Sequence, residues 1–226
     1  MENKLIVSSS PHVRSNEDTS YIMKQVIIAL VPAALAGLFY FRLNALSAMF
    51  FCILGTVGSE HIFCKIMKKK STIGDFSAVV TGLLLAFNVP ASLPWWMCLL
   101  GGIFAMVVVK MVFGGIGCNF VNPALAARAF LLASFPVAMT AWTKTGVNFV
   151  SSANLDAVST ATPLSFLKAG PAGLADLAAN NISLSDMFLG NTGGCIGETC
   201  ALLVILGGVY LIYKGIISYV MPVAYI

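Results

Sequence analysis

Hydrophobic residues occur in runs long enough to form membrane-spanning helices, separated by short polar stretches and one long polar loop. A bilayer core about 30 Å thick requires about 20 mostly apolar residues per helix. Five such runs precede the loop and two follow it, at residues 21–41, 45–67, 76–89, 95–113, 122–140, 198–213 and from 216 onward. The third run is short, so it is tilted, broken or re-entrant. The pattern predicts an all-α polytopic membrane protein folded as a helical bundle.

These runs divide the chain into four parts. Residues 1–20 form a polar N-terminal segment, residues 21–140 a first membrane helix set of about five helices, residues 141–197 a loop, and residues 198–226 the start of a second helix set. The chain stops at Ile226, a few residues into the last apolar run. We therefore expect the second helix set to be truncated.

The composition agrees with a membrane protein surrounded by lipid. Of the 226 residues, 58% are hydrophobic and only 10% are charged, with a mean hydropathy of +0.90. Soluble domains carry roughly 25% charged residues. Too few polar groups remain to cover a globule in water, which excludes a soluble enzyme and a disordered tail. A net charge of +4 without a dense basic face excludes a nucleic-acid partner.

The basic residues indicate an orientation, because cytoplasmic loops carry an excess of Lys and Arg. With the N-terminus in the cytoplasm, nine basic residues lie on the cytoplasmic side and three lie outside. The nine are Lys4, Arg14, Lys24, Lys65, Lys68, Lys69, Lys70, Lys110 and Lys214, and the three are Arg42, Lys144 and Lys168. Five crossings then place the loop 141–197 outside the cytoplasm. A re-entrant third segment would reverse that placement.

The loop is rich in Ser, Thr, Asn, Gly and Ala, and it contains Asp156 followed by Ser159-Thr160-Ala161-Thr162 ahead of Pro163. By composition alone, Ser and Thr ahead of a proline indicate a turn. The motif also resembles the flavinylation motif of the NqrB/RnfD family. Members of that family are membrane subunits of the sodium-pumping NADH:quinone reductase and of the Rnf ferredoxin:NAD oxidoreductase.

The resemblance implies that Thr162 carries FMN through a phosphoester bond. A Thr hydroxyl is a poor nucleophile by itself, so a separate flavin transferase would activate it and supply the FMN. Asp156 would be recognised by the transferase or would orient the hydroxyl, and the small Ala161 would leave the acceptor accessible. Such transferases act on the outer face, in agreement with the orientation derived from charge.

Four further stretches resemble the same family, in the same order along nearly the whole chain. They are Ser9-Ser10-Pro11-His12 with Arg14, the block 75–96, the glycine-rich stretch 114–124, and Gly194-Cys195-Ile196-Gly197-Glu198-Thr199. The short N-terminal segment resembles the Rnf branch of the family. The resemblance implies a helical bundle of two inverted repeats of five helices, of which the first and the start of the second are present.

For function, the resemblance implies the electron-transferring D subunit of an Rnf-type complex in a bacterial or archaeal plasma membrane. Ferredoxin oxidation and NAD reduction would be coupled to Na+ or H+ translocation, with sister subunits and a flavin transferase as partners. FMN would supply the redox chemistry, so no catalytic acid, base or nucleophile and no metal site is expected in this chain. The alternative is a transporter- or channel-like scaffold without its own redox cofactor, which would have no reason to carry the acceptor motif.

The stretch 114–124 is a glycine-rich turn that opens a helix, with Pro123 near the first helical position. Free backbone N–H groups at a helix start can bind an anion or the edge of a flavin. Gly114, Gly117, Asn119 and Asn122 are therefore candidates for a second, non-covalent flavin site or for part of an ion path. The alternative is a broken helix packed tightly between its neighbours.

Arg128, Glu198 and Thr199 are further candidate flavin contacts. An Arg inside a membrane helix is costly unless it is paired or hydrated, so Arg128 should face the bundle interior. Glu198 should act as an acidic residue at the start of its helix. Because the two residues are predicted at different depths, the sequence does not pair them.

Two other groups of residues have chemistry but no assigned role. Glu60 and His61 are either an interfacial pair that extends to the lipid headgroups or part of a proton relay, and we favour the interfacial pair. The six cysteines contain no CxxC pair and are expected to behave mostly as small hydrophobic residues. Cys195 and Cys200 would bind a metal only if another chain supplied further ligands.

Overall fold

The computed structural model describes residues 18–69, 71–142, 163–168, 184–190, 193–198 and 200–225. All regular secondary structure within these residues is helical. In addition, Pro90 and Cys195 form an isolated antiparallel β-bridge. The prediction of an all-α protein is therefore confirmed.

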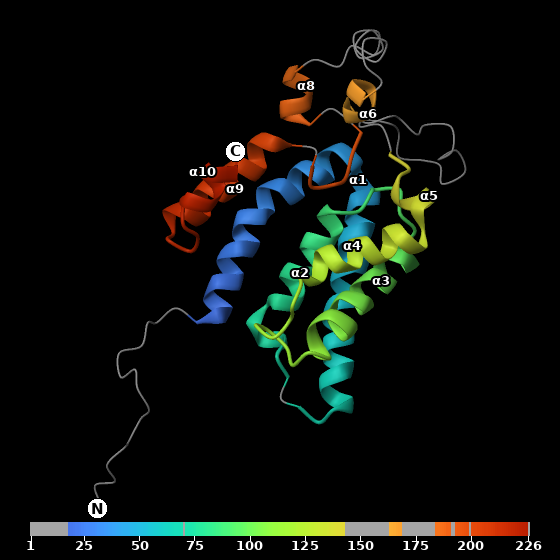
Figure 1. Cartoon of the computed structure of the whole chain (residues 1–226), viewed down its shortest axis with the longest axis vertical. Helices are drawn as coiled ribbons and strands as arrows, with labels where there is room; N and C mark the ends of the chain where they lie inside the picture. Colours follow the sequence, from blue (N-terminus) through green and yellow to red (C-terminus); the bar gives the residue numbers. More distant parts are fainter. Residues whose placement is uncertain are drawn as a thin grey trace, which may run out of the picture.

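The first helix, α1 (Thr19–Ile66), is 48 residues long and bends sharply at Arg42. At the bend Arg42 has φ 54° and ψ −127°, outside the helical region and costly for a residue with a side chain. Figure 1 shows two arms that meet at the bend like an inverted V, so the chain rises along one arm and descends along the other. The arms correspond to the first two predicted runs, 21–41 and 45–67.

The next three apolar runs form shorter helices. A 3-10 turn, η1 (Ile73–Asp75), leads into α2 (Ser77–Phe87). The helix α3 (Trp95–Phe104) continues as a π-helix, η2 (Ala105–Met111).

The fifth run, predicted as one segment over 122–140, is broken in the structure. It divides into α4 (Pro123–Ser134) and the short α5 (Pro136–Met139). Phe135 between them has φ −134° and ψ 60°. A residue that precedes a proline is sterically disfavoured in the α conformation, so Pro136 ends α4.

The remaining described helices are α6 (Pro163–Lys168), α8 (Leu184–Leu189), α9 (Ala201–Tyr213) and α10 (Val220–Tyr225). The predicted run 198–213 therefore begins three residues late, with Cys200 as the residue before the helix. Glu198 lies in the turn that precedes α9, so the expectation that it would be an acidic residue within the first turn of that helix is wrong.

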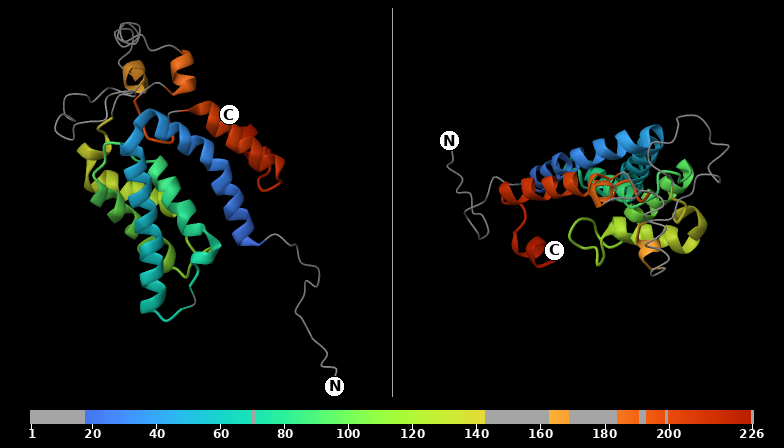
Figure 2. Two further views of the ribbon diagram at one scale, coloured as in Figure 1. Left: turned by 180° about the vertical axis from the view of Figure 1, so that it is seen from behind. Right: turned by 90° about the horizontal axis from the view of Figure 1, so that it is seen from above.

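Both arms of α1 pack against other helices of the bundle. Helix α1 contacts α2, α3 and α9, and α4 covers α2, α3 and η2 on the other side (Figure 2). The approach of α1 to α3 is so close that a Cβ atom on Gly55 would lie 2.7 Å from the carbonyl oxygen of Leu99. Small residues at helix crossings allow this close packing in membrane proteins.

The bundle has two chemically different ends. The bend of α1 lies at the same end as α6 and α8 (Figure 1), and the Tyr40 hydroxyl donates to the carbonyl oxygen of Leu189 at 2.8 Å. The turn between α1 and α2, which follows Lys65 and contains Lys68 and Lys69, lies at the opposite end. Lys70 lies outside the described residues.

Among the described residues, α1 is the helix that is long and apolar enough by itself to cross a bilayer. Shorter apolar helices are α2, α3 with its continuation η2, α4 and α9. The inverted-repeat arrangement and the membrane topology stay predictions.

Candidate functional site

The predicted FMN acceptor lies outside the described residues. Thr162 directly precedes Pro163, the first residue of α6. The other members of the motif, Asp156, Ser159, Thr160 and Ala161, are also outside the described residues, as is Thr199. Their assignment to a flavin stays a prediction.

A polar cluster around Arg128 lies where the chain returns from the loop to the bundle. From α4, the Arg128 guanidinium donates through Nη1 to Asn88 Oδ1 at 3.0 Å. Its Nη2 donates to Cys195 Sγ at 3.9 Å, and Nη1 lies 3.9 Å from Glu198 Oε1. One cation thus connects α4, the end of α2 and the turn 193–198.

The turn 193–198 is held against the end of α2 by its backbone. The N–H of Ile196 donates to the carbonyl oxygen of Val89 at 3.3 Å, and the N–H of Gly197 donates to that of Phe87 at 3.0 Å. A Cβ atom on Gly197 would lie 2.5 Å from Cβ of Phe87, so only glycine allows this approach. These contacts fix Glu198 beside Arg128.

The thiol of Cys195 is buried in this cluster and stays protonated. Burial, together with the nearby carboxylate of Glu198, raises the pKa of the Cys195 thiol to about 12, although Arg128 opposes this shift. A thiolate is the form that binds metals and attacks electrophiles, so Cys195 acts here as a neutral packing group. The part of the chain that the structure describes contains no group of three or more His, Cys, Asp or Glu that could hold a metal.

The structure therefore pairs Arg128 with Glu198, which the sequence did not. Arg128 is half-buried at 34% exposure and Glu198 is 59% exposed, so the guanidinium is only partly enclosed by the bundle. Sequence analysis missed Asn88 as a partner. The sequence feature that could have indicated Asn88 was its position as a polar residue at the end of the apolar run 76–89, two positions before Pro90.

The glycine-rich turn before α4 is a separate feature. Gly114, Gly115 and Gly117 all have positive φ, as the turn prediction implies. The N–H groups of Gly114 and Gly115 donate to the carbonyl oxygens of Met111 and Lys110, so they are not free to bind an anion. A Cβ atom on Gly115 or Gly117 would meet nothing within 4 Å, so the turn is not packed tightly between neighbours.

The two asparagines of this stretch have structural partners. The Asn122 side chain accepts from the N–H of Ala124 at 3.0 Å and caps α4, whose first residue is Pro123. Asn119 donates through Nδ2 to the carbonyl oxygen of Val121 at 2.8 Å. A role for these residues beside a second flavin stays a prediction.

Glu60 and Lys110 differ from their predicted positions. Glu60 is 0% exposed, and it lies 3.0 Å from the Lys110 ammonium, which is 3% exposed. The expectation that Glu60 would extend to the headgroups is wrong, and Lys110, which was counted among the cytoplasmic-side charges, is buried inside the bundle. His61, in contrast, is exposed.

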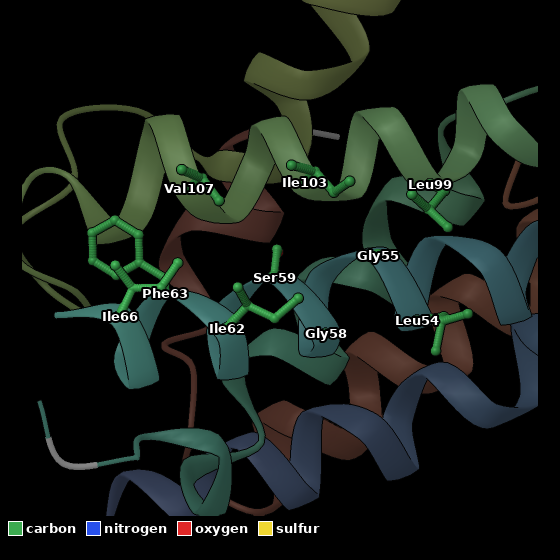
Figure 3. Close-up of a pocket in the computed structure, with 10 residues that line it drawn as sticks. All are labelled: Leu54, Gly55, Gly58, Ser59, Ile62, Phe63, Ile66, Leu99, Ile103 and Val107. Atoms are coloured by element: carbon green, nitrogen blue, oxygen red, sulfur yellow. The ribbon is translucent and has the colours of Figure 1, made fainter. Parts of the chain in front are cut away.

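An apolar pocket of about 380 Å³ lies between the second arm of α1 and the α3–η2 helix (Figure 3). The polar side chain in its lining is Ser59, whose hydroxyl donates to the carbonyl oxygen of Thr56 at 3.0 Å. An alkyl chain fits this chemistry, whereas the polar edge of a flavin would find no partner among the lining side chains.

The sequence matches a known family along nearly its whole length. The model of the NQR2, RnfD, RnfE family matches residues 6–226. The D subunit of the Na(+)-translocating ferredoxin:NAD(+) oxidoreductase complex of Acetobacterium woodii is 48% identical over 227 residues, covering 100% of this chain and 67% of the relative. The D subunit of the proton-translocating ferredoxin:NAD(+) oxidoreductase complex of Clostridium ljungdahlii is 43% identical with the same coverage. The D subunit of the ion-translocating oxidoreductase complex of Halorhodospira halophila is 32% identical, covering 95% of this chain and 66% of the relative.

Proposed function

Because the chain belongs to the NQR2, RnfD, RnfE family, we propose that it is the D subunit of an Rnf-type ferredoxin:NAD+ oxidoreductase complex. Its part is to transfer electrons within a membrane complex that couples ferredoxin oxidation and NAD reduction to ion translocation. The observation that carries the proposal is the 48% identity over the whole chain to a protein of that name. The relatives from Acetobacterium woodii and Clostridium ljungdahlii are described with different ions, Na+ and H+, so the family alone does not decide the coupling ion.

In this proposal the redox cofactor of the protein is FMN, joined through a phosphoester bond to Thr162. The motif from Asp156 to Thr162 supports the attachment, and a flavin transferase supplies the FMN. When bound, the flavin provides one- and two-electron redox chemistry. The residues of this chain hold it, set its surroundings and limit its contact with water.

Among the described residues, Arg128 supports a flavin in this region. Arg128 presents a half-buried guanidinium beside the turn that closes the loop, and Glu198 balances only part of its charge at 3.9 Å. A guanidinium can donate to a phosphate oxygen or to the electron-rich edge of a reduced flavin. Arg128 is therefore the described residue that we propose as a flavin contact.

The loop lies on the extracytoplasmic side in this proposal, and the N-terminus lies in the cytoplasm. Support comes from the two ends of the bundle, because α6 and α8 lie opposite the turn that holds Lys68 and Lys69 (Figure 1). The positive-inside rule assigns that turn to the cytoplasm. Labelling of a cysteine introduced at Lys168 with a membrane-impermeant maleimide in intact cells tests this orientation.

Covalent attachment is tested by in-gel flavin fluorescence after co-expression with the flavin transferase. We expect a fluorescent band for the natural chain, no band for Thr162→Ala, and a normal band for the matched control Thr140→Ala, which lies outside the motif. A dark band for the natural chain, with the transferase active on a control substrate, would overturn the electron-carrier proposal. A transport scaffold without its own cofactor would then be the better account.

A further inference from the structure

The apolar pocket between the second arm of α1 and the α3–η2 helix is a groove that opens on the side of the bundle. Four of the apolar side chains that line it are 40–72% exposed: Leu54, Ile62, Ile66 and Ile103. Leu54 and Ile66 lie twelve positions apart in α1, so the groove follows the helix for about 18 Å. One leaflet is half of a hydrocarbon core about 30 Å thick. The groove therefore has roughly the length of one lipid chain.

Two glycines of α1 explain why the groove exists. At Gly55 the two helices touch, because a Cβ atom there would lie 2.7 Å from the carbonyl oxygen of Leu99. One helical turn further, at Gly58, a Cβ atom would meet nothing within 4 Å. Gly58 lines the groove, so a larger side chain at this position would occupy the space that glycine keeps open.

The lining favours an alkyl chain over a polar ligand. Its polar side chain is Ser59, which is buried and whose hydroxyl already donates to the carbonyl oxygen of Thr56 at 3.0 Å. A polar group placed in the groove would find no partner among these side chains, and leaving it unpaired is costly. An alkyl chain instead gains dispersion contacts with both helices.

Three lysines lie at one end of the groove. Figure 3 shows Phe63 and Ile66 at this end, in the last turns of α1. Lys65 belongs to the last turn of the helix, Lys68 and Lys69 follow directly after it, and all three are exposed. Within the described part of the chain, no ion pair to any of these lysines is found. The apolar groove thus ends at an unneutralised positive cluster.

The acidic groups of the neighbouring elements are engaged elsewhere. Glu60 is paired with Lys110 inside the bundle at 3.0 Å, and Asp75 accepts two hydrogen bonds from the first residue of α2. The dipole of α1 favours a cation within its last turn, which accounts for Lys65 but not for the two lysines beyond the helix. Basic pockets between membrane helices are typical binding sites for anionic lipid headgroups.

We propose that this groove binds an anionic phospholipid. One acyl chain lies between α1 and the α3–η2 helix, and the headgroup phosphate is held by Lys65, Lys68 and Lys69. A lipid on a flat helix face would bind whatever its charge, so selectivity for an anionic headgroup distinguishes this site from general contact with the bilayer. The inference does not depend on the flavin assignment, and only the choice of the cytoplasmic leaflet rests on the orientation under the proposed function.

The test is native mass spectrometry of the full chain in a non-ionic detergent, with dioleoyl phosphatidylglycerol or dioleoyl phosphatidylcholine as the probe. We expect one phosphatidylglycerol to bind about tenfold more tightly than phosphatidylcholine. The triple variant Lys65→Gln/Lys68→Gln/Lys69→Gln should bind the two lipids equally. Lys214→Gln, which removes an exposed lysine after α9 and outside the groove, is the control and should keep the preference.

A second pair of variants tests the acyl chain. Gly58→Leu fills the groove and should weaken phosphatidylglycerol binding about tenfold. The matched control is Gly208→Leu in α9, where a Cβ atom also meets nothing within 4 Å, and it should bind like the natural chain. Unchanged binding in folded Gly58→Leu, or equal affinity of the natural chain for the two lipids, would overturn the proposal.

Photo-crosslinking keeps the test decisive if a variant fails to fold. Phosphatidylglycerol with a diazirine in the middle of one acyl chain, bound to the natural chain, should label peptides that contain residues 54–66 and 99–107. Labelling confined to other helices would refute the site. Displacement by an isoprenoid quinone at lower concentration than by unlabelled phosphatidylglycerol would assign the groove to a quinone tail and also refute it. Thr162→Ala should bind the lipid normally, so a failure of this inference is distinguishable from a failure of the flavin assignment.

Discussion

The crossing of α1 and α3 allows a quantitative prediction, because two glycines one helical turn apart have opposite surroundings. In Gly55→Ala the new Cβ would lie 2.7 Å from the carbonyl oxygen of Leu99 and 3.2 Å from its Cα. Ordinary contact begins at 3.4 Å, so the two backbones would have to separate by about 0.7 Å. In Gly58→Ala the new Cβ meets nothing within 4 Å and extends beside the apolar pocket.

The difference between the two variants isolates the packing contribution. Replacing glycine by alanine inside a helix stabilises it by about 1 kcal/mol at either position. At Gly55 this gain is offset by overpacking, which costs about 1–3 kcal/mol when backbone must move. We therefore expect Gly58→Ala to be about 1 kcal/mol more stable than the natural chain, and Gly55→Ala to be about 1–3 kcal/mol less stable than Gly58→Ala.

The assay is reversible unfolding in mixed micelles, with the helical circular-dichroism signal followed as the fraction of denaturing detergent rises. The free energy of unfolding is compared between the two variants and the natural chain under identical conditions. Equal stability of Gly55→Ala and Gly58→Ala, within about 0.5 kcal/mol, would show that α1 and α3 do not approach as closely as the structure describes.

Three further outcomes follow from individual contacts. The exposed Cys118 should react with a maleimide at pH 8, whereas the buried Cys195, with its pKa raised to about 12, should be modified only after unfolding, as peptide mass spectrometry would show. Arg128→Met should raise the pKa of Cys195 further, because the guanidinium lowers it, so folded Cys195 in this variant should still be unmodified by the maleimide at pH 8 in the same mass-spectrometric assay. Asn122→Ala should lower the free energy of unfolding by about 1 kcal/mol through loss of the α4 cap, and Asn122→Asp should not.

The sequence by itself determined which apolar segments are helical and which family the chain belongs to, but not the short helices α6 and α8 within the predicted loop 141–197. Apolar runs separated by charged or glycine-rich stretches are local signals, and they placed both arms of α1, the start of α4 at Pro123 and the existence of α9 close to their observed bounds. Local chemistry also explains the main error in the first helix set, because the proline at 136 was present in the sequence and ends α4. The stretch from Asp156 to Thr162, which resembles a flavinylation motif, was likewise visible as a short contiguous pattern.

Only the tertiary structure decided which polar side chains meet. Lys110 and Glu60 are 50 positions apart, and Arg128 and Asn88 are 40 apart. Their contacts depend on the rotation of each helix about its axis and on its depth relative to its neighbours. Hydrophobic periodicity does not specify these quantities when a helix is apolar on most of its surface, since lipid and protein interior are similarly apolar. The sequence therefore favoured Glu60 at the headgroups and counted Lys110, near the end of the run 95–113, among the cytoplasmic-side charges, whereas packing brought both into one buried pair.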